Sequence, residues 1–452
     1  MANEKEPSQL FDAFVFPRVF QAFRQAIQPS KLIIALLAVA VLCGVGQIMD
    51  LSKPVAATAN NQGQVTQTEL QVYMTNPAQV PSFIEANRPT GMRVGIFSTL
   101  WHFSTSRFHG AIFRLFVLDI PGVARNIAEF FKAFAWAFRY HTIYTIVFFI
   151  IALAVISVTG GAICRAAALQ CARGEKPGLT EALSFSTKRF VSFFATPLTP
   201  IGIIVFIGLF IFVLGLIGNI PWVGELLMGI CMPLTLIAGG LIAAVAIGAV
   251  VGLDLMFPAI AYDNSDCFDS ISRSFSYVYA RPWHIIFYTV VAAIYGAICY
   301  VFVRFFSFVL LWGSYRILRL GVLGNNSKLN AIWPEPHFAN FLGHSASAAG
   351  NWSETIAALL VYIFVLAIIG LLISFVLSFY FSANTIIYAL MRSKVDNTAI
   401  DDVYTYSEEP EATPSVAERE ADETKPSSAG DTQPESTSEE SRTPEEPPPS
   451  EQ

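Results

Sequence analysis

The sequence predicts an all-α integral membrane protein: a polytopic bundle of about six transmembrane helices, with interfacial amphipathic helices and a disordered C-terminal tail. Hydrophobic residues make up 54% of the 452 residues and charged residues only 14%, a balance too apolar for a typical soluble domain. The apolar residues are gathered into six long runs, and each is long enough to cross a bilayer. The last 52 residues, by contrast, are polar and acidic.

Residues 1–31 are predicted to be an N-terminal segment in the cytoplasm. Within it, residues 10–27 place phenylalanines on one helical face and arginines and glutamines on the opposite face. This pattern is typical of a helix that lies in the membrane interface.

The first span is predicted at residues 32–50, a run that follows Lys31 and carries no charge before Asp50. A cleavable signal is the alternative, because Ala57-Thr58-Ala59 has the small-residue spacing of a cleavage site. The segment before the run is too long and too rich in phenylalanine for a usual signal. We therefore expect the first span to be retained as an anchor.

An exported loop is predicted at residues 51–140. It is polar at first and becomes aromatic and amphipathic from residue 94, so we expect it to return along the outer membrane interface. Five further apolar runs complete a six-span domain over residues 32–400. They lie at about 142–164, 191–218, 226–257, 284–313 and 355–390.

The basic residues predict that both termini lie in the cytoplasm, in the plasma (bacterial inner) membrane. The short loops and flanks on one side hold twelve basic residues, whereas the two short loops on the other hold three. Cytoplasmic loops are enriched in Lys and Arg. The twelve are Arg18, Arg24, Lys31, Arg165, Arg173, Lys176, Lys188, Arg189, Arg273, Arg281, Arg392 and Lys394, and the three are Arg316, Arg319 and Lys328.

Charge is divided unevenly along the chain. Residues 401–452 contain 16 acidic and 3 basic residues, which leaves 18 acidic and 25 basic residues for the rest. The mildly basic body suits a membrane protein and argues against a nucleic-acid partner. The acidic tail carries too few apolar residues to fold on its own, so we expect it to be disordered and to be a place where protein partners bind.

A weak internal repeat relates two loops at an offset of 88 residues. Glu181–Ser186 lies over Asp269–Ser274, and each stretch follows a polar turn and precedes an aromatic entry to the next span. One interpretation is a cytoplasmic elbow helix used twice, which also offers a surface to protein partners. The alternative is that any amphipathic loop helix between spans shows this pattern.

Two stripes of small residues predict close helix packing, because small side chains let helix backbones approach in lipid. They are Gly240, Ala244, Gly248 and Gly252 in the fourth span and Gly370, Ser374, Ser378 and Ser382 in the sixth. Either the stripes meet each other, or each packs on a different neighbour or on another copy.

Two ionisable residues inside the predicted spans, Asp254 and Arg304, are functional candidates by default. Arg304 stands about 20 residues into the fifth span, so at about 1.5 Å per residue the two should lie near opposite membrane faces. We expect interface anchoring rather than an ion relay. Glu225 or Glu354 is then the expected partner of Arg304, and Arg165 or headgroups that of Asp254.

No residue pattern predicts a catalytic site, a cofactor or a metal. Asp263, Asp266 and Asp269 have a spacing that can hold magnesium, but Asp266 and Asp269 also suit the N-cap and first turn of a helix, which is the interpretation we favour. Four histidines lie on the outer side in no recognised ligand motif. They are His102, His109, His337 and His344.

Three juxtamembrane stretches carry a family resemblance: Gln28–Leu32, Ser270–Tyr277 before Arg281-Pro282-Trp283, and Tyr388–Asp396 continuing to Asp402–Tyr404. Over residues 28–404 the chain resembles a group of uncharacterised bacterial multi-pass membrane proteins. More distantly, it is similar to the membrane domain that accompanies some glycerophosphodiester phosphodiesterases. No phosphodiesterase domain is present, so the resemblance implies no such activity.

Three functions are compatible with these patterns. The first is a non-enzymatic scaffold or accessory subunit of a membrane assembly. The second is a transporter or channel for a small or lipid-like solute, which prolines 197, 200 and 233 favour if they bend the third and fourth spans. The third and most distant is a lipid-headgroup enzyme that uses the aspartates at 263, 266 and 269.

Overall fold

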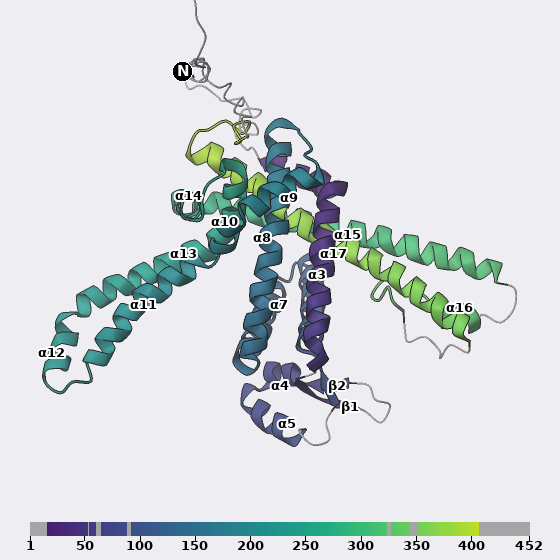
Figure 1. Ribbon diagram of the computed structural model, residues 1–452, viewed down its shortest axis with the longest axis horizontal. Helices are drawn as coiled ribbons and strands as arrows, with labels where there is room; N and C mark the ends of the chain where they lie inside the picture. Colours follow the sequence, from purple (N-terminus) through teal and green to yellow (C-terminus); the bar gives the residue numbers. More distant parts are fainter. Residues whose placement is uncertain are drawn as a thin grey trace, which may run out of the picture. The chain divides into compact units, whose positions relative to one another are not determined.

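The computed structural model describes residues 16–52, 54–59, 65–87, 92–322, 327–343 and 351–405. Six of the helices in this part are long and apolar enough to cross a membrane. They are α3 (Pro29–Met49), α8 (Thr142–Arg173), α11 (Thr199–Ile217), α13 (Met232–Asp263), α15 (Pro282–Gly321) and α17 (Trp352–Val395) (Figure 1). The predicted fold class is therefore confirmed, and the chain is a multi-pass membrane protein.

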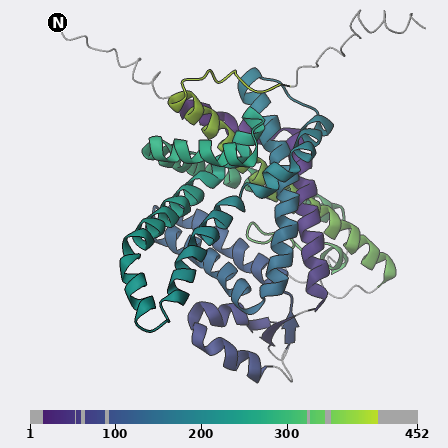
Figure 2. The same ribbon diagram turned by 60° about the vertical axis from the view of Figure 1, so that its left-hand side comes forward.

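α17, the longest helix in the described part of the chain, is buried over only part of its length. α17 has 44 residues, about 66 Å at about 1.5 Å per residue, against a hydrocarbon core of about 30 Å. Its residues from Leu372 to Arg392 are mostly buried in the protein, whereas the turns before Leu372 mostly expose apolar side chains. α11 and the first half of α13 lie side by side and are similarly exposed (Figures 1 and 2). Lipid is the solvent that such surfaces require.

Proline marks helix boundaries in the third and fourth spans. The third is divided into α10 (Phe190–Ala195) and α11, with Pro200 in the first turn of α11. In the predicted fourth span, residues 226–257, the helix is interrupted next to Pro233. Pro233 lies in the first turn of α13, after the separate helix α12 (Val223–Ile230), where its missing N–H would have no helical partner in any case.

The loop of residues 51–140 contains a small sheet that the sequence did not predict. β1 (Val55–Ala59) pairs antiparallel with β2 (Val65–Thr68) and with β3 (Met92–Val94). These strands are short and lack the alternation of apolar and polar residues that identifies strands. The loop also holds 3-10 turns and four helices: η2 (Asp50–Ser52), α4 (Glu69–Thr75), η3 (Pro77–Gln79), α5 (Val80–Ala86), α6 (Ile96–Phe116) and α7 (Ile120–Tyr140).

Asp50 fixes the loop of residues 51–140 to the first span. Its carboxylate accepts hydrogen bonds from the backbone N–H groups of Phe97 (2.9 Å) and Ser98 (2.7 Å) at the start of α6, and from the Tyr144 hydroxyl of α8 (2.8 Å). A side chain in place of Gly95 would collide with this carboxylate. A negative charge at a helix N-terminus is favourable, so Asp50 sets where α6 begins.

Two elbow helices follow spans of equal length, as the repeat interpretation requires. α8 and α13 each have 32 residues and end at a residue in the left-handed region, Gly174 and Asn264. α9 (Leu179–Lys188) and α14 (Cys267–Ala280) then begin 88 residues apart and pack back on the span before them. In each elbow a buried serine donates a hydrogen bond to a carbonyl of that span.

The charged ends of several spans meet in one polar cluster, which we call the junction: Asp263, Arg273, Tyr388 and Arg392. The Asp263 carboxylate pairs with Arg392 at 3.2 Å and Arg273 at 3.4 Å, and accepts a short hydrogen bond from Tyr388. The side chains of Asp263 and Arg392 are each only 9% exposed. The junction thus joins α13, α14 and α17 through one buried carboxylate.

Residues 396–404, which we call the strap, cross the junction after α17 ends. Arg392 donates hydrogen bonds to the Asp402 carbonyl (2.5 Å) and carboxylate (3.0 Å). Arg165 of α8 donates to the carbonyls of Ala261 (2.9 Å) and Tyr404 (2.7 Å). The N-terminal helices η1 (Phe16–Phe20) and α2 (Gln21–Ala26) pack on the same end of α17.

Replacing Asp263 with Asn should destabilise the protein strongly. Two arginines would then face a neutral amide, and breaking one side of a buried pair costs about 3 kcal/mol or more. Thermal unfolding in detergent measures the effect as a lower midpoint. Asp266→Asn is the control, because Asn caps helices as well as Asp does. Equal midpoints for both variants would contradict the role of the junction.

Two truncated chains distinguish the contribution of the strap to stability from that of the acidic tail. A chain that ends after Thr405 keeps every strap contact and should unfold at the wild-type temperature. A chain that ends after Asp396 leaves Arg165 without the Tyr404 carbonyl and Arg392 without the Asp402 carbonyl. Each unsatisfied buried group costs about 1–3 kcal/mol, so this chain should unfold at a lower temperature. The same midpoint for both truncations would show that the strap contributes nothing.

Candidate functional site

Two adjoining cavities lie between helices α6 and α7, which follow the first span in the chain, and spans α15 and α17. One, which we call the Asp254 cavity, measures about 410 Å³, and the other, the Arg304 cavity, about 370 Å³. They share Phe108, Tyr300 and Val376 in their linings. Volumes of about 300–1,000 Å³ are usual for sites that hold small molecules.

Small residues on one face of α15 leave the room for the Asp254 cavity. The small residues are Ala293, Gly296 and Ala297, the last two being three and four residues after the first. Tyr300 follows the last two at four and three residues, so it lies on the same helix face. The rest of the lining is largely apolar, from α6, α7 and α17. A side chain at Gly296 would collide with the Phe379 ring, so the glycine also allows α17 to lie close.

The Arg304 cavity has a polar centre. The Arg304 guanidinium donates hydrogen bonds to the Tyr300 hydroxyl (3.0 Å) and to the carbonyl of Phe338 (2.9 Å), and a short one to His109 of α6. It also lies over the rings of Phe338 and Phe341, at 5.2 and 5.4 Å from their centroids. These neighbours are all uncharged, and no carboxylate forms an ion pair with Arg304 in the described part of the chain.

His109 adds no positive charge at neutral pH. Burial, and then the nearby Arg304 guanidinium, lower the pKa of His109 to about 4. The neutral ring lies with its Nε2 atom 2.7 Å from the Tyr300 hydroxyl. The cluster of His109, Tyr300 and Arg304 therefore carries the single charge of the guanidinium.

Asp254 lines the other cavity and binds a different partner from the one expected. It accepts a hydrogen bond of 2.5 Å from the Tyr380 hydroxyl of α17. Arg165, the expected partner, is held by the backbone at the junction. Arg304 likewise donates hydrogen bonds to His109, Tyr300 and two loop carbonyls, and not to the expected Glu225 or Glu354. The two candidates line neighbouring cavities, and no contact joins them directly.

The structure places the small-residue stripes against different neighbours. Beside Gly248 and Gly252 lie side chains of α14, and the Ala244 carbonyl accepts a hydrogen bond from Tyr279 of the same elbow (2.5 Å). Gly240 has no atom near the position of an added Cβ among the described residues.

In the sixth span, Gly370 lies near Leu36 of α3, and Ser378 donates to the Ala26 carbonyl at 2.8 Å. Ser374 donates to the carbonyl of Gly370 within its own helix, and Ser382 is fully buried. The two stripes thus hold the elbow and the N-terminal helices rather than each other.

The aspartates and histidines form no metal site in the described part of the chain. Asp266 caps α14 by accepting a hydrogen bond from the Asp269 N–H at 2.9 Å, so the capping interpretation is confirmed. Asp269 pairs with Arg273 at 3.0 Å, and Asp263 belongs to the junction. His344 lies outside the described residues.

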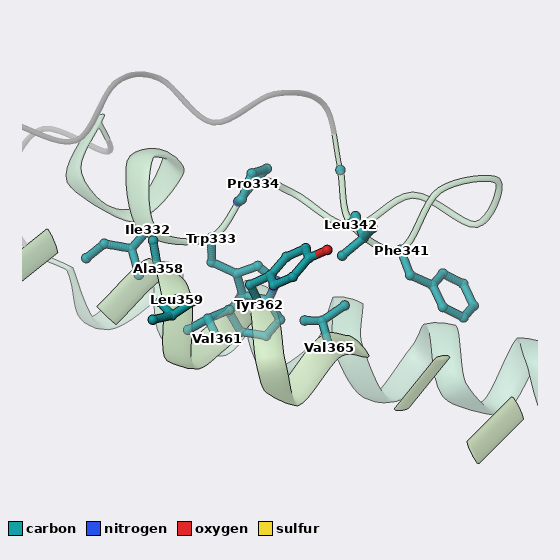
Figure 3. Close-up of a pocket in the computed structure, with 11 residues that line it drawn as sticks. Ile332, Trp333, Pro334, Phe341, Leu342, Ala358, Leu359, Val361, Tyr362 and Val365 are labelled. Carbon is teal, nitrogen blue, oxygen red and sulfur yellow. The ribbon is translucent and has the colours of Figure 1, made fainter. Parts of the chain in front are cut away.

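A third cavity, of about 410 Å³, lies beside the first turns of α17. Aliphatic and aromatic side chains line it, among them Trp333, Leu359, Tyr362 and Val365 (Figure 3). It adjoins α16 (Ser327–Ile332) and the loop that follows. Because none of its lining residues is charged, this cavity offers little to orient a ligand.

No family model, curated protein or solved structure matches this chain. The resemblance to bacterial multi-pass membrane proteins therefore stays a prediction. Two of its three stretches meet in space, because Tyr277 donates to Asp396 (2.5 Å), and within the third stretch Arg392 binds Asp402. In the first stretch, Lys31 donates to Gln170 of α8 (2.9 Å). Those residues hold the ends of the spans together, which is a structural role.

Proposed function

We propose that this protein binds a lipid-like solute in the Asp254 and Arg304 cavities, as a transporter or carrier does, and that it is not an enzyme. The observation that carries the proposal is a mainly apolar lining over two adjoining cavities, with the Asp254 carboxylate in one cavity and the Arg304 guanidinium in the other. Pockets with a mainly apolar lining and a few placed polar groups are typical of ligand sites. The lipid bilayer that surrounds the spans is the nearest source of such a solute.

The basic residues also support a membrane orientation. We propose that both termini lie on the cytoplasmic side of the plasma membrane, which is the inner membrane in a bacterium. Twelve basic residues in the short segments on the side of the termini, against three on the other side, support this orientation.

A scaffold or accessory subunit is the second candidate. The strap favours it, because this segment is docked on the junction immediately before the acidic tail. The elbows α9 and α14, and separately the acidic tail, would then present surfaces to protein partners.

Filling the Asp254 cavity should reduce lipid binding. Ala293 lines the cavity and is exposed to it, so Ala293→Trp should lower covalent labelling by a photoactivatable phospholipid severalfold in reconstituted protein. Mass spectrometry of the labelled peptides from α6 and α15 measures the change. The control is Ile294→Trp, an exposed neighbour that does not line the cavity. Equal labelling of the wild type and both variants would refute the proposal.

A further inference from the structure

We propose that the occupant is an anionic phospholipid whose phosphate binds the Arg304 guanidinium and whose acyl chain lies along the Asp254 cavity. The inference rests on the proposed function and specifies its ligand. It follows from the charge of the polar cluster, from the groups beside it and from the arrangement of charge along the two cavities.

The charge of Arg304 is not balanced by an acid in the described part of the chain. Its hydrogen-bond partners are a phenol, a neutral imidazole and two backbone carbonyls. Its Nε atom is buried and lacks a partner among the described residues. A cation placed among apolar side chains is unfavourable unless an anion accompanies it, so the site is electrostatically complementary to a negatively charged group.

The neighbouring groups suit a phosphate better than a choline or ethanolamine head. A guanidinium has five donors in a planar fork that matches phosphate oxygens, and Ser104, Thr105 and Asn340 add polar side chains to the same lining. The Phe338 and Phe341 rings already face the guanidinium. A quaternary ammonium would compete with Arg304 for those rings and would be repelled by its charge.

The two cavities also set the direction of the bound lipid. Asp254 lines the cavity that lacks Arg304, and Arg304 lines the cavity that lacks Asp254. An anionic head is attracted to Arg304 and repelled by Asp254. The two cavities share Phe108, Tyr300 and Val376 in their linings. An acyl chain that lies along these side chains buries apolar surface.

The test compares two lipids with identical acyl chains, phosphatidylglycerol and phosphatidylcholine, on the full chain purified in mild detergent. Native mass spectrometry measures how much of each lipid stays bound. We expect the wild type to prefer phosphatidylglycerol by about tenfold and Arg304→Gln to lose that preference. Arg304→Lys should keep part of it, because the charge stays and the planar fork is lost.

Arg319→Gln is the matched control, because Arg319 lies on the same helix and pairs with Glu335 at 3.9 Å, away from both cavities. It should keep the full preference. Inorganic phosphate should not displace the phosphatidylglycerol, because the acyl chain contributes to binding. Displacement by inorganic phosphate at millimolar concentration would overturn the lipid as the ligand in favour of a free anion.

Two further outcomes separate this inference from the proposed function. If both lipids bind the wild type equally, the anionic ligand is wrong, and if Arg304→Gln keeps the preference, the binding of the phosphate by Arg304 is wrong. In either case a loss of both lipids in Ala293→Trp would still support the cavity as a lipid site. If Ala293→Trp also retains both lipids, the proposed function fails as well. Tyr300→Phe provides a second variant if Arg304→Gln does not fold, and it should weaken the preference in the same direction.

Discussion

The buried ion pair between Asp263 and Arg392 is the contact on which the arrangement of the spans depends. Helices in lipid gain no hydrophobic free energy from associating, so packing and polar contacts must hold them together. In this protein many of the buried polar contacts between spans are gathered at one end of the bundle, where α8, α13, α14, α17 and the strap meet. Away from that end, α11, α13 and the first half of α17 expose apolar side chains.

The polar contacts at one end of the bundle, and the exposed apolar helices away from it, explain where the cavities lie. The later turns of α17 contain the junction residues Tyr388 and Arg392. The earlier turns of α15, from Ile285 to Cys299, pack against them in the main hydrophobic core. The hairpin of α6 and α7 reaches the same pair of spans through Phe108, His109 and Ile127. The small residues of α15 fill little of the volume between these elements, so space remains beside Tyr300.

Local patterns allowed the spans, the elbows and the Asp266 cap to be predicted from the sequence. Hydropathy and helix capping act over a few consecutive residues, and they are therefore visible in one chain. The polar cluster of the Arg304 cavity was not predicted, because His109 and Arg304 are 195 residues apart and each alone resembles an interfacial residue. The sheet was missed for a different reason: β1, Val55-Ala-Ala-Thr-Ala, is paired through its backbone and carries no alternating pattern.

The central claim is that the ends of α8, α13 and α17 meet on one side of the membrane. Topology reporters fused after Glu175, after Ser265 and after Asn397 measure this most directly, with a fourth fusion after Asn326 for comparison. The account predicts that the first three reporters share one side and that the fourth is on the other. A reporter after Asn397 on the same side as the one after Asn326 would contradict it, because the Asp263–Arg392 pair could not then form.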